Sequence, residues 1–204
     1  MTGNKAVAEP LFRVSGLKVA LPDMTRKPLI GRAPLIEILN GLDFELPRHQ
    51  VTGIVGESGS GKSTLGRALV RLIEPTAGNV VFDGRDITHL PETELRPLRR
   101  NLQMIFQDPM SSLNPRRTIG AIIAAPLKQN GLGNDIGARV AAALKRVSLP
   151  ESFAKRYRHE LSGGQRQRVG IARALALCPG FVLADEIVSG LDVSTQAQIL
   201  TLLE

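Results

Sequence analysis

Apolar residues along this chain gather in short runs typical of strands and in longer stretches with helical spacing. The strand-like runs occupy residues 12–21, 36–46, 51–55, 80–82, 102–106 and 181–184. Stretches with helical periodicity lie at 61–74, 140–147, 163–177 and 194–204. Because strands alternate with helices, the pattern predicts an α/β fold with a mostly parallel sheet.

Two stretches of the pattern refine this expectation. The β-branched run Val51–Val55 ends at a glycine and suits a buried strand, and the helix after it keeps its apolar spacing until Pro75. Apolar residues at i, i+3, i+4 and i+7 from Val140 onward predict a helix capped by Asn134 or Asp135. This second region, after a polar loop at 108–117, predicts a helical lobe inserted into the α/β fold.

Composition and charge narrow the class of protein. With 43% hydrophobic residues the chain can bury a core, and its single cysteine allows no internal disulfide, which favours a reducing compartment. No stretch of the sequence holds the ~20 apolar residues that a membrane-spanning helix needs. The N-terminus lacks the apolar core of a secretory signal peptide. The net charge of +7 favours nucleic acid, an anionic membrane surface or a phosphate-bearing ligand as binding partner. Only 3% of the residues are aromatic, however, so side chains that could stack on the bases of single-stranded nucleic acid are nearly absent.

A glycine-rich segment between the predicted strand 51–55 and the following helix carries the first chemical signal. Gly56–Ser63 matches the pattern G-x-x-x-x-G-K-[ST] of a phosphate-binding loop. Glycines let backbone N–H groups close around phosphate oxygens, Lys62 reaches the β- and γ-phosphates, and the Ser63 hydroxyl can ligate Mg²⁺. A glycine turn without function is a poor alternative because strand, spacing and Lys-Ser are all present.

Two consecutive carboxylates follow the apolar run 181–184. Asp185 stands where a metal-binding carboxylate is expected at the end of a strand, and Glu186 is placed to act as general base on the water that attacks the γ-phosphate. Taken alone, an Asp-Glu pair can simply cap a helix. Beside the phosphate loop, the catalytic interpretation is favoured.

The pentapeptide Leu161–Gln165, Leu-Ser-Gly-Gly-Gln, stands just before a predicted helix. It resembles the signature motif of ATP-binding-cassette (ABC) ATPases. Ser162 and the glycine N–H groups at a helix start can form an anion site, and Ser162 can also be a plain N-cap. The two uses can coexist.

Three longer segments extend the resemblance over nearly the whole chain from Leu11. They are 106–116 (FQDPMSSLNPR), 159–169 (HELSGGQRQRV) and 192–200 (DVSTQAQIL). They resemble the ATPase subunits of oligopeptide, dipeptide and nickel importers. The resemblance implies a single nucleotide-binding domain of the ABC type with an antiparallel N-terminal β part, a core lobe at about 11–107 and 178–204, and a helical signature lobe at about 108–177.

The resemblance also implies a role for each matching residue, with ATP and Mg²⁺ as cofactors. Gln107 would sense Mg²⁺ and the γ-phosphate, joining Ser63 and Asp185 as metal-site residues, and Lys62, Gln107 and Glu186 would serve catalysis. The residues expected to contact ATP within the chain are Gly56, Glu57, Ser58, Gly59, Ser60, Gly61, Lys62, Ser63, Thr64, Gln107 and Asp185. Those expected to contact the ATP of a second subunit are Ser162, Gly163, Gly164, Gln165 and Asp192.

Partners and location follow from the same resemblance. A second ABC ATPase, identical or not, would pair head to tail with this chain, and both would dock on transmembrane permease subunits served by a solute-binding protein. The expected location is peripheral, on the cytoplasmic face of the inner membrane, and no nucleic acid partner is expected. The sequence does not indicate which solute is carried, although peptide is favoured.

Several positions depart from the family pattern. Leu21 stands where an aromatic residue usually stacks on adenine, 187–191 differ from the usual Pro-Thr-Ser-Ala-Leu, and Arg158 replaces a proline. The family's switch histidine follows its D-loop by roughly thirty residues, whereas all three histidines here precede Asp192. The strand that carries it would also be missing and leave a gap in the sheet. The missing histidine and Leu21 leave a non-hydrolysing nucleotide-binding module as an alternative. The net charge of +7 and the arginines at 96, 99, 100, 116 and 117 leave a soluble ABC ATPase associated with nucleic acid as another.

Overall fold

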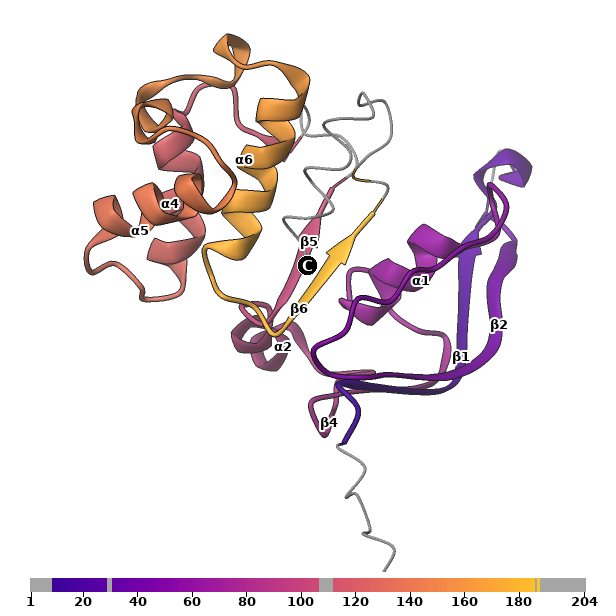
Figure 1. Ribbon diagram of the computed structural model, residues 1–204. Helices are drawn as coiled ribbons and strands as arrows, with labels where there is room; N and C mark the ends of the chain where they lie inside the picture. Colours follow the sequence, from indigo (N-terminus) through magenta and orange to yellow (C-terminus); the bar gives the residue numbers. More distant parts are fainter. Residues whose placement is uncertain (1–8, 29–30, 107–111, 186, 188–204) are drawn as a thin grey trace, which may run out of the picture. The chain divides into compact units, whose positions relative to one another are not determined.

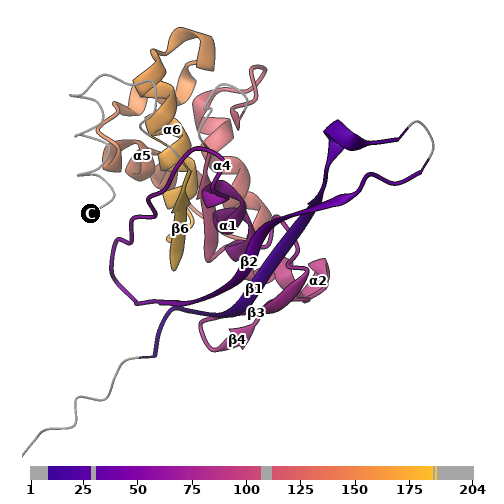
Figure 2. The ribbon, with the colours of Figure 1, turned by 90° about the vertical axis from the view of Figure 1, so that its right-hand side faces the viewer.

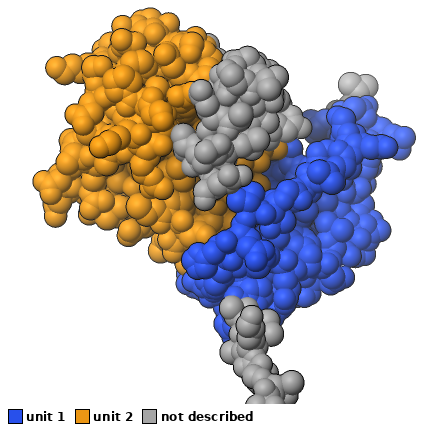
Figure 3. Space-filling model, in the orientation of Figure 1, with its two compact units in different colours: residues 1–95 blue, residues 96–204 orange. Residues whose placement is uncertain are grey.

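The structure is a computed structural model that describes residues 9–28, 31–106, 112–185 and 187. The chain divides into two compact units, Met1–Leu95 and Arg96–Glu204 (Figure 3). The lobe boundaries expected from the sequence stay a prediction.

Unit 1 is built on a four-stranded antiparallel sheet (Figures 1 and 2). Its strand order is β2-β1-β3-β4. The strands are β1 (Phe12–Pro22), β2 (Leu35–Leu46), β3 (Ala77–Phe82) and β4 (Arg85–Asp86). A short 3-10 helix, Met24–Arg26, lies in the connection from β1 to β2 that the sequence predicts as a loop. The antiparallel N-terminal β part is thus confirmed.

The sheet stays closely packed because two glycines meet where β1 and β3 shift register. Gly16 interrupts β1 with a φ of 58°, and the pairing of β1 with both neighbours shifts at this point. Gly78 in β3 has a φ of 83°, and a Cβ placed there would lie 2.3 Å from the carbonyl oxygen of Gly16. Only glycine combines that backbone conformation with that close an approach.

The expected buried strand at 51–55 is wrong. These residues form an irregular segment in which Val51, Ile54 and Val55 are 78%, 44% and 94% exposed. Among the described residues, no strand pairs with this run. Hydrophobic runs predict strands because a neighbouring strand satisfies their backbone, and without that neighbour the β-branched side chains have nothing to pack against.

The helix after the glycine loop ends earlier than its apolar spacing predicts. Helix α1 spans Lys62–Leu69 instead of continuing to Pro75. Arg71 takes a left-handed backbone conformation, φ 54°, and its guanidinium donates to the carbonyl of Ile87 at 2.7 Å. This buried bond to a distant segment turns the chain away from the helix axis, so Leu72 is half exposed.

A polar cluster ties the β3–β4 hairpin together. Asp86 Oδ1 accepts hydrogen bonds from the Thr88 hydroxyl at 2.6 Å and the Thr88 N–H at 2.8 Å, and Oδ2 accepts from Asn79 at 3.0 Å. The Thr88 hydroxyl in turn accepts from the Val80 N–H at 2.7 Å. The Thr88 side-chain hydrogen bond is the main reason that the pKa of Asp86 lies below its usual value.

We expect the contribution of Asp86 to stability to disappear in acid. A lowered native pKa means that the stabilisation is present above the unfolded-state value, ~3.9, and is lost as the pH falls through the native value. Asp86→Asn is therefore expected to cost at most about 1 kcal/mol at pH 7, since the site is largely exposed, and less near pH 3. Urea denaturation of both proteins at the two pH values checks this. A difference that stays constant with pH would contradict it.

Unit 2 combines a two-stranded parallel sheet with a helical layer (Figure 1). Helix α2 (Glu92–Leu98) crosses from unit 1 into unit 2. The remaining elements are β5 (Leu102–Ile105), α4 (Ile119–Gln129), α5 (Ile136–Arg146), the 3-10 helices η2 (Glu151–Lys155) and η3 (Arg158–Glu160), α6 (Gly163–Leu175) and β6 (Phe181–Ala184). The two strands pair in register from Leu102 with Phe181 to Ile105 with Ala184.

The core of unit 2 lies between α4, α5 and α6. Ile119, Ile123, Leu144, Val169 and Ile171 are at most 1% exposed and belong to one continuous apolar cluster. The helical spacing around Val140 therefore reports a buried face, as predicted. The expected cap is only partly right, because residue 135 occupies the N-cap position of α5 but makes no side-chain capping bond.

Candidate nucleotide-binding site

The glycine-rich loop of unit 1 leads directly into α1. Gly61 is the N-cap residue of this helix and has a φ of 91°, and Gly59 has a φ of 80°. The N-cap is a glycine and therefore makes no side-chain capping bond. Such a helix start is a suitable site for an anion, because backbone N–H donors and the positive end of the helix dipole coincide there.

The loop is shaped for glycine at its first and last positions. A Cβ at Gly56 would lie 2.9 Å from the hydroxyl oxygen of Ser60, and one at Gly61 would lie 3.0 Å from Leu39 of β2. Side chains at these two places would fill the loop or push it off the sheet. The residues present therefore fit a phosphate group, which needs the backbone to approach it closely.

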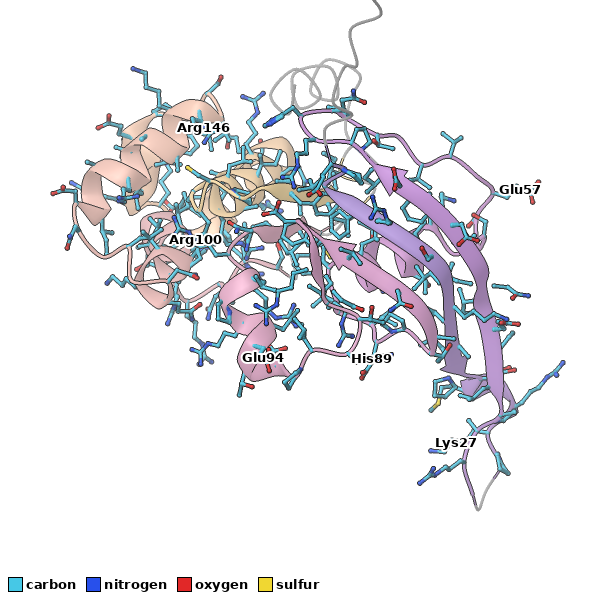
Figure 4. All side chains as sticks on the ribbon, turned by 90° about the horizontal axis from the view of Figure 1, so that it is seen from below. Lys27, Glu57, His89, Glu94, Arg100 and Arg146 are labelled. Carbon is cyan, nitrogen blue, oxygen red and sulfur yellow. The ribbon has the colours of Figure 1, made fainter. Side chains whose placement is uncertain are left out.

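Lys62 points back into the loop that precedes it. Its Nζ donates to the carbonyl of Gly56 at 2.8 Å and to that of Glu57 at 2.6 Å. These bonds hold the ammonium against the loop and pair it with backbone carbonyls. The Glu57 side chain, by contrast, points away from the body of its unit (Figure 4). The loop therefore presents a cation and backbone donors, with its one carboxylate directed outward.

The next residues of α1 provide the hydroxyl groups expected near a metal. Ser63 and Thr64 follow Lys62 in the first helical turn and are partly buried. A serine hydroxyl and a carboxylate such as Asp185 are hard oxygen ligands, the type that Mg²⁺ prefers. Their chemistry fits a magnesium nucleotide, and their ligand roles stay a prediction.

The start of α6 in unit 2 holds the second motif. The Ser162 hydroxyl oxygen accepts from the Gln165 N–H at 3.3 Å, and the Gln165 side-chain oxygen accepts from the Ser162 N–H at 3.0 Å. This capping box uses a lone pair of the hydroxyl and leaves its O–H group able to donate. Gly163 and Gly164 form the first turn without side chains over it. Ser162 is thus an N-cap, and its anion-site role stays a prediction.

Asp185 follows β6 at the end of the parallel strand pair. Its N–H donates to the carbonyl of Ile105 at 3.2 Å, which extends the pairing of β5 with β6 by one bond. Gln107, Glu186 and Asp192 lie outside the described residues, so their roles stay predictions. The described site residues fall into two sets, Gly56–Thr64 in unit 1 and Ser162–Gln165 with Asp185 in unit 2.

Sequence reasoning assigned no structural role to the arginines around the signature motif. Arg158 and Arg173 donate from η3 and α6 to the carbonyls of Leu113 and Ser112. Nearby, Gln167 is 2% exposed, and within the described part of the chain its Nε2 has no hydrogen-bond partner. The only signal in the sequence was the density of arginine after residue 155, which by itself indicates a charged surface.

The glycine loop, its lysine and the helix that begins directly after the loop define a P-loop nucleotide-binding protein. The sequence profile of the ABC transporter family matches residues 39–189. This chain belongs to that family, and the predicted family and fold class are confirmed. Among the described residues, no helix has the length and apolar character needed to cross a membrane.

Several known proteins resemble the chain closely. A Bacillus subtilis oligopeptide transport ATP-binding protein is 51% identical over 172 residues, which cover 83% of this chain and 52% of the relative. A glutathione import ATP-binding protein of Salmonella paratyphi A is 49% identical over 198 residues, 96% of this chain and 32% of the relative. A dimeric ATP-binding cassette solved with ADP and phosphate has a TM-score of 0.80 at 31% identity, covering 94% of this chain and 81% of that one.

The chain thus spans about a third to a half of these two curated relatives. The cassette structure, in contrast, is covered over four fifths of its length. The match to the family is therefore a match to its nucleotide-binding part.

Proposed function

We propose that this chain is the ATP-binding and hydrolysing subunit that energises an ABC importer, with peptides as the favoured cargo. The observation that carries the proposal is the phosphate loop, which leads through Gly61 into α1 and holds the Lys62 ammonium against its own carbonyls. Its setting in a chain about half identical to oligopeptide and glutathione import ATP-binding proteins supports the importer assignment.

In the proposed mechanism the residues of unit 1 hold the nucleotide. The N–H groups of the loop and of the first turn of α1 donate to phosphate oxygens, and Lys62 exchanges its bonds to the carbonyls of Gly56 and Glu57 for a contact with the β- and γ-phosphates. Ser63, Gln107 and Asp185 would hold Mg²⁺. When bound, that ion neutralises the charge that develops on the transferred phosphoryl group.

The remaining residues complete the reaction. Glu186 accepts the proton of the attacking water, which makes the water a better nucleophile. Ser162, Gly163, Gly164 and Gln165 contact the nucleotide held by a second ATPase subunit, together with Asp192. Binding of ATP between the two subunits then closes the pair and hydrolysis reopens it, which drives permease subunits at the cytoplasmic face of the membrane.

We expect Lys62→Ala to remove both ATP binding and turnover. Loss of the ammonium takes away a charge-assisted contact to the phosphates, so turnover is expected to fall by about 10²-fold or more. The test measures ATP hydrolysis with Mg²⁺ beside binding of a fluorescent ATP analogue. Lys145→Ala, an exposed lysine in the last turn of α5, is the matched control and is expected to leave both values unchanged.

The outcomes separate the functional hypotheses. Turnover that does not depend on Lys62 would contradict the proposed hydrolytic site. Binding that depends on Lys62 but occurs without turnover would favour the non-hydrolysing nucleotide-binding module. A DNA or RNA affinity that depends steeply on salt and is much tighter than phosphate contacts alone provide would instead favour the nucleic-acid-associated ATPase.

A further inference from the structure

Two arginines of unit 2 bind consecutive carbonyl groups of one short segment. Arg173, in the last turn of α6, donates through Nη1 to the carbonyl of Ser112 at 2.6 Å. Arg158, in η3, donates through Nη1 to the carbonyl of Leu113 at 2.7 Å. We call these two interactions the arginine clamp, and residues 112–117 the clamped segment.

The clamp lies in a partly buried setting that strengthens it. Leu113 is 1% exposed and belongs to the core of unit 2, so its carbonyl is held close to the apolar interior. Burial lowers the pKa of Arg173, yet a guanidinium stays protonated in proteins. A bond from a charged donor in such surroundings is shorter and stronger than a neutral one. The clamp is therefore a firm link at neutral pH.

A third arginine extends the link to the start of α6. Arg166 donates through Nε to the carbonyl of Arg158 at 3.1 Å and to that of Leu161 at 2.9 Å. Arg166 lies one helical turn after Ser162, the N-cap of the signature helix. Hydrogen bonds thus connect the first turn of α6 with η3, and η3 with the clamped segment.

One end of this network, the start of α6, carries the predicted nucleotide contacts Ser162–Gln165. The clamped segment begins five residues after Gln107 in the sequence, and α6 begins directly after Ser162. The buried side chain of Leu113 anchors the segment in the core of unit 2, but an apolar contact fixes its position less closely than directional hydrogen bonds do. With the clamp in place, a displacement of the clamped segment or of α6 pulls on carbonyls that are bonded to the other.

We propose that Arg158 and Arg173 are positioning residues that make the clamped segment and α6 move as one body. The proposal rests on the proposed function, since it concerns how the start of α6, with Ser162, is positioned during turnover. Neither arginine touches the nucleotide in this proposal. Placement errors of about 1 Å in supporting structure can cost up to about 10²-fold in rate, so a positioning role is measurable.

The test removes each guanidinium and keeps the apolar stem. Arg173→Met and Arg158→Met lose the clamp donors, whereas Arg173→Lys keeps a cation that can restore one bond. Arg146→Met removes an exposed arginine at the end of α5 (Figure 4) and serves as the matched control. Each purified full chain is measured for amide hydrogen exchange, ATP affinity and kcat, with the folded fraction taken from circular dichroism.

We expect both methionine variants to exchange the amides of the clamped segment about 10-fold faster, while the amides of α5 keep their rates. The kcat per folded molecule should fall about 10-fold. The ATP dissociation constant should stay within about twofold of that of the unchanged chain, because the phosphate loop is intact. Arg173→Lys should recover part of both losses, and Arg146→Met should change neither.

Unchanged exchange in the clamped segment would overturn the link, and faster exchange with an unchanged kcat would overturn the positioning role. If Arg173→Met does not fold, Arg158→Met and Arg173→Lys decide the same question. The exchange measurement needs no ATP. If the chain shows no Lys62-dependent ATP turnover, the proposed function is therefore contradicted. The exchange rates would still test the link between the clamped segment and α6.

Discussion

Glu186→Gln will remove ATP turnover and leave ATP binding intact. The amide has the size of the carboxylate but cannot accept a proton from the attacking water, so the rate of hydrolysis is expected to fall by about 10² to 10⁴-fold. In the proposed function, binding depends on Lys62 and the loop N–H groups, which the substitution does not alter. The measurement is single-turnover hydrolysis of ATP beside equilibrium binding of the same nucleotide.

The control for this experiment is a glutamate remote from the predicted chemistry. Glu151→Gln changes an exposed residue at the start of η2 and is expected to hydrolyse ATP like the unchanged chain. Turnover that survives Glu186→Gln would take the general-base role away from this residue. A parallel loss of binding would instead place Glu186 among the nucleotide contacts.

Gly78→Ala will destabilise unit 1 severely. An alanine Cβ would sit 2.3 Å from the Gly16 carbonyl oxygen and 2.6 Å from that of Ser15, and both are backbone atoms that cannot rotate aside. The left-handed φ of 83° adds its own penalty for a residue with a side chain. We expect a loss of about 3 to 5 kcal/mol in the free energy of unfolding, measured by urea denaturation.

Gly84→Ala separates the steric part of this loss from the conformational part. Gly84 has a φ of 77° in the adjoining β3–β4 turn, but a Cβ there meets nothing within 4 Å. Its substitution should cost about 1 kcal/mol, the penalty of the left-handed conformation alone. Equal losses at the two positions would show that the close contact between β1 and β3 contributes little.

Much of the fold could be predicted from local sequence patterns, because these patterns reflect interactions between residues that lie close together in the chain. The apolar run 12–21 and the alternation in 36–46 predict strands, and the structure has β1 and β2 there; alternate residues of β1 are buried, whereas the apolar face of β2 is mostly only partly buried. The run 51–55 has the same composition as a buried strand, yet burial also depends on a neighbouring strand, which composition does not reveal. The early end of α1 depends on Arg71 reaching a carbonyl sixteen residues away.

In the candidate site, too, the contiguous motifs could be predicted from the sequence, whereas contacts between distant residues could not. Gly56–Ser63 and Ser162–Gln165 are contiguous motifs whose geometry is made by their own backbone, so the sequence could place them next to helix starts. The contacts of Arg158 and Arg173 join residues 45 and 61 positions apart. Nothing in the spacing of arginines indicates which carbonyls they will meet.

The exposed run Val51–Val55 has a consequence for handling the protein. Three of its residues are β-branched valine or isoleucine with large exposed surfaces, and the run carries no charge. Short uncharged β-formers with open backbone are templates for intermolecular cross-β contacts and aggregation. Because the run leads directly into the glycine loop, self-association at this point would also block access to the phosphate site. We therefore expect solubility and nucleotide binding to be linked, because the exposed run 51–55 adjoins the loop 56–61 that precedes Lys62.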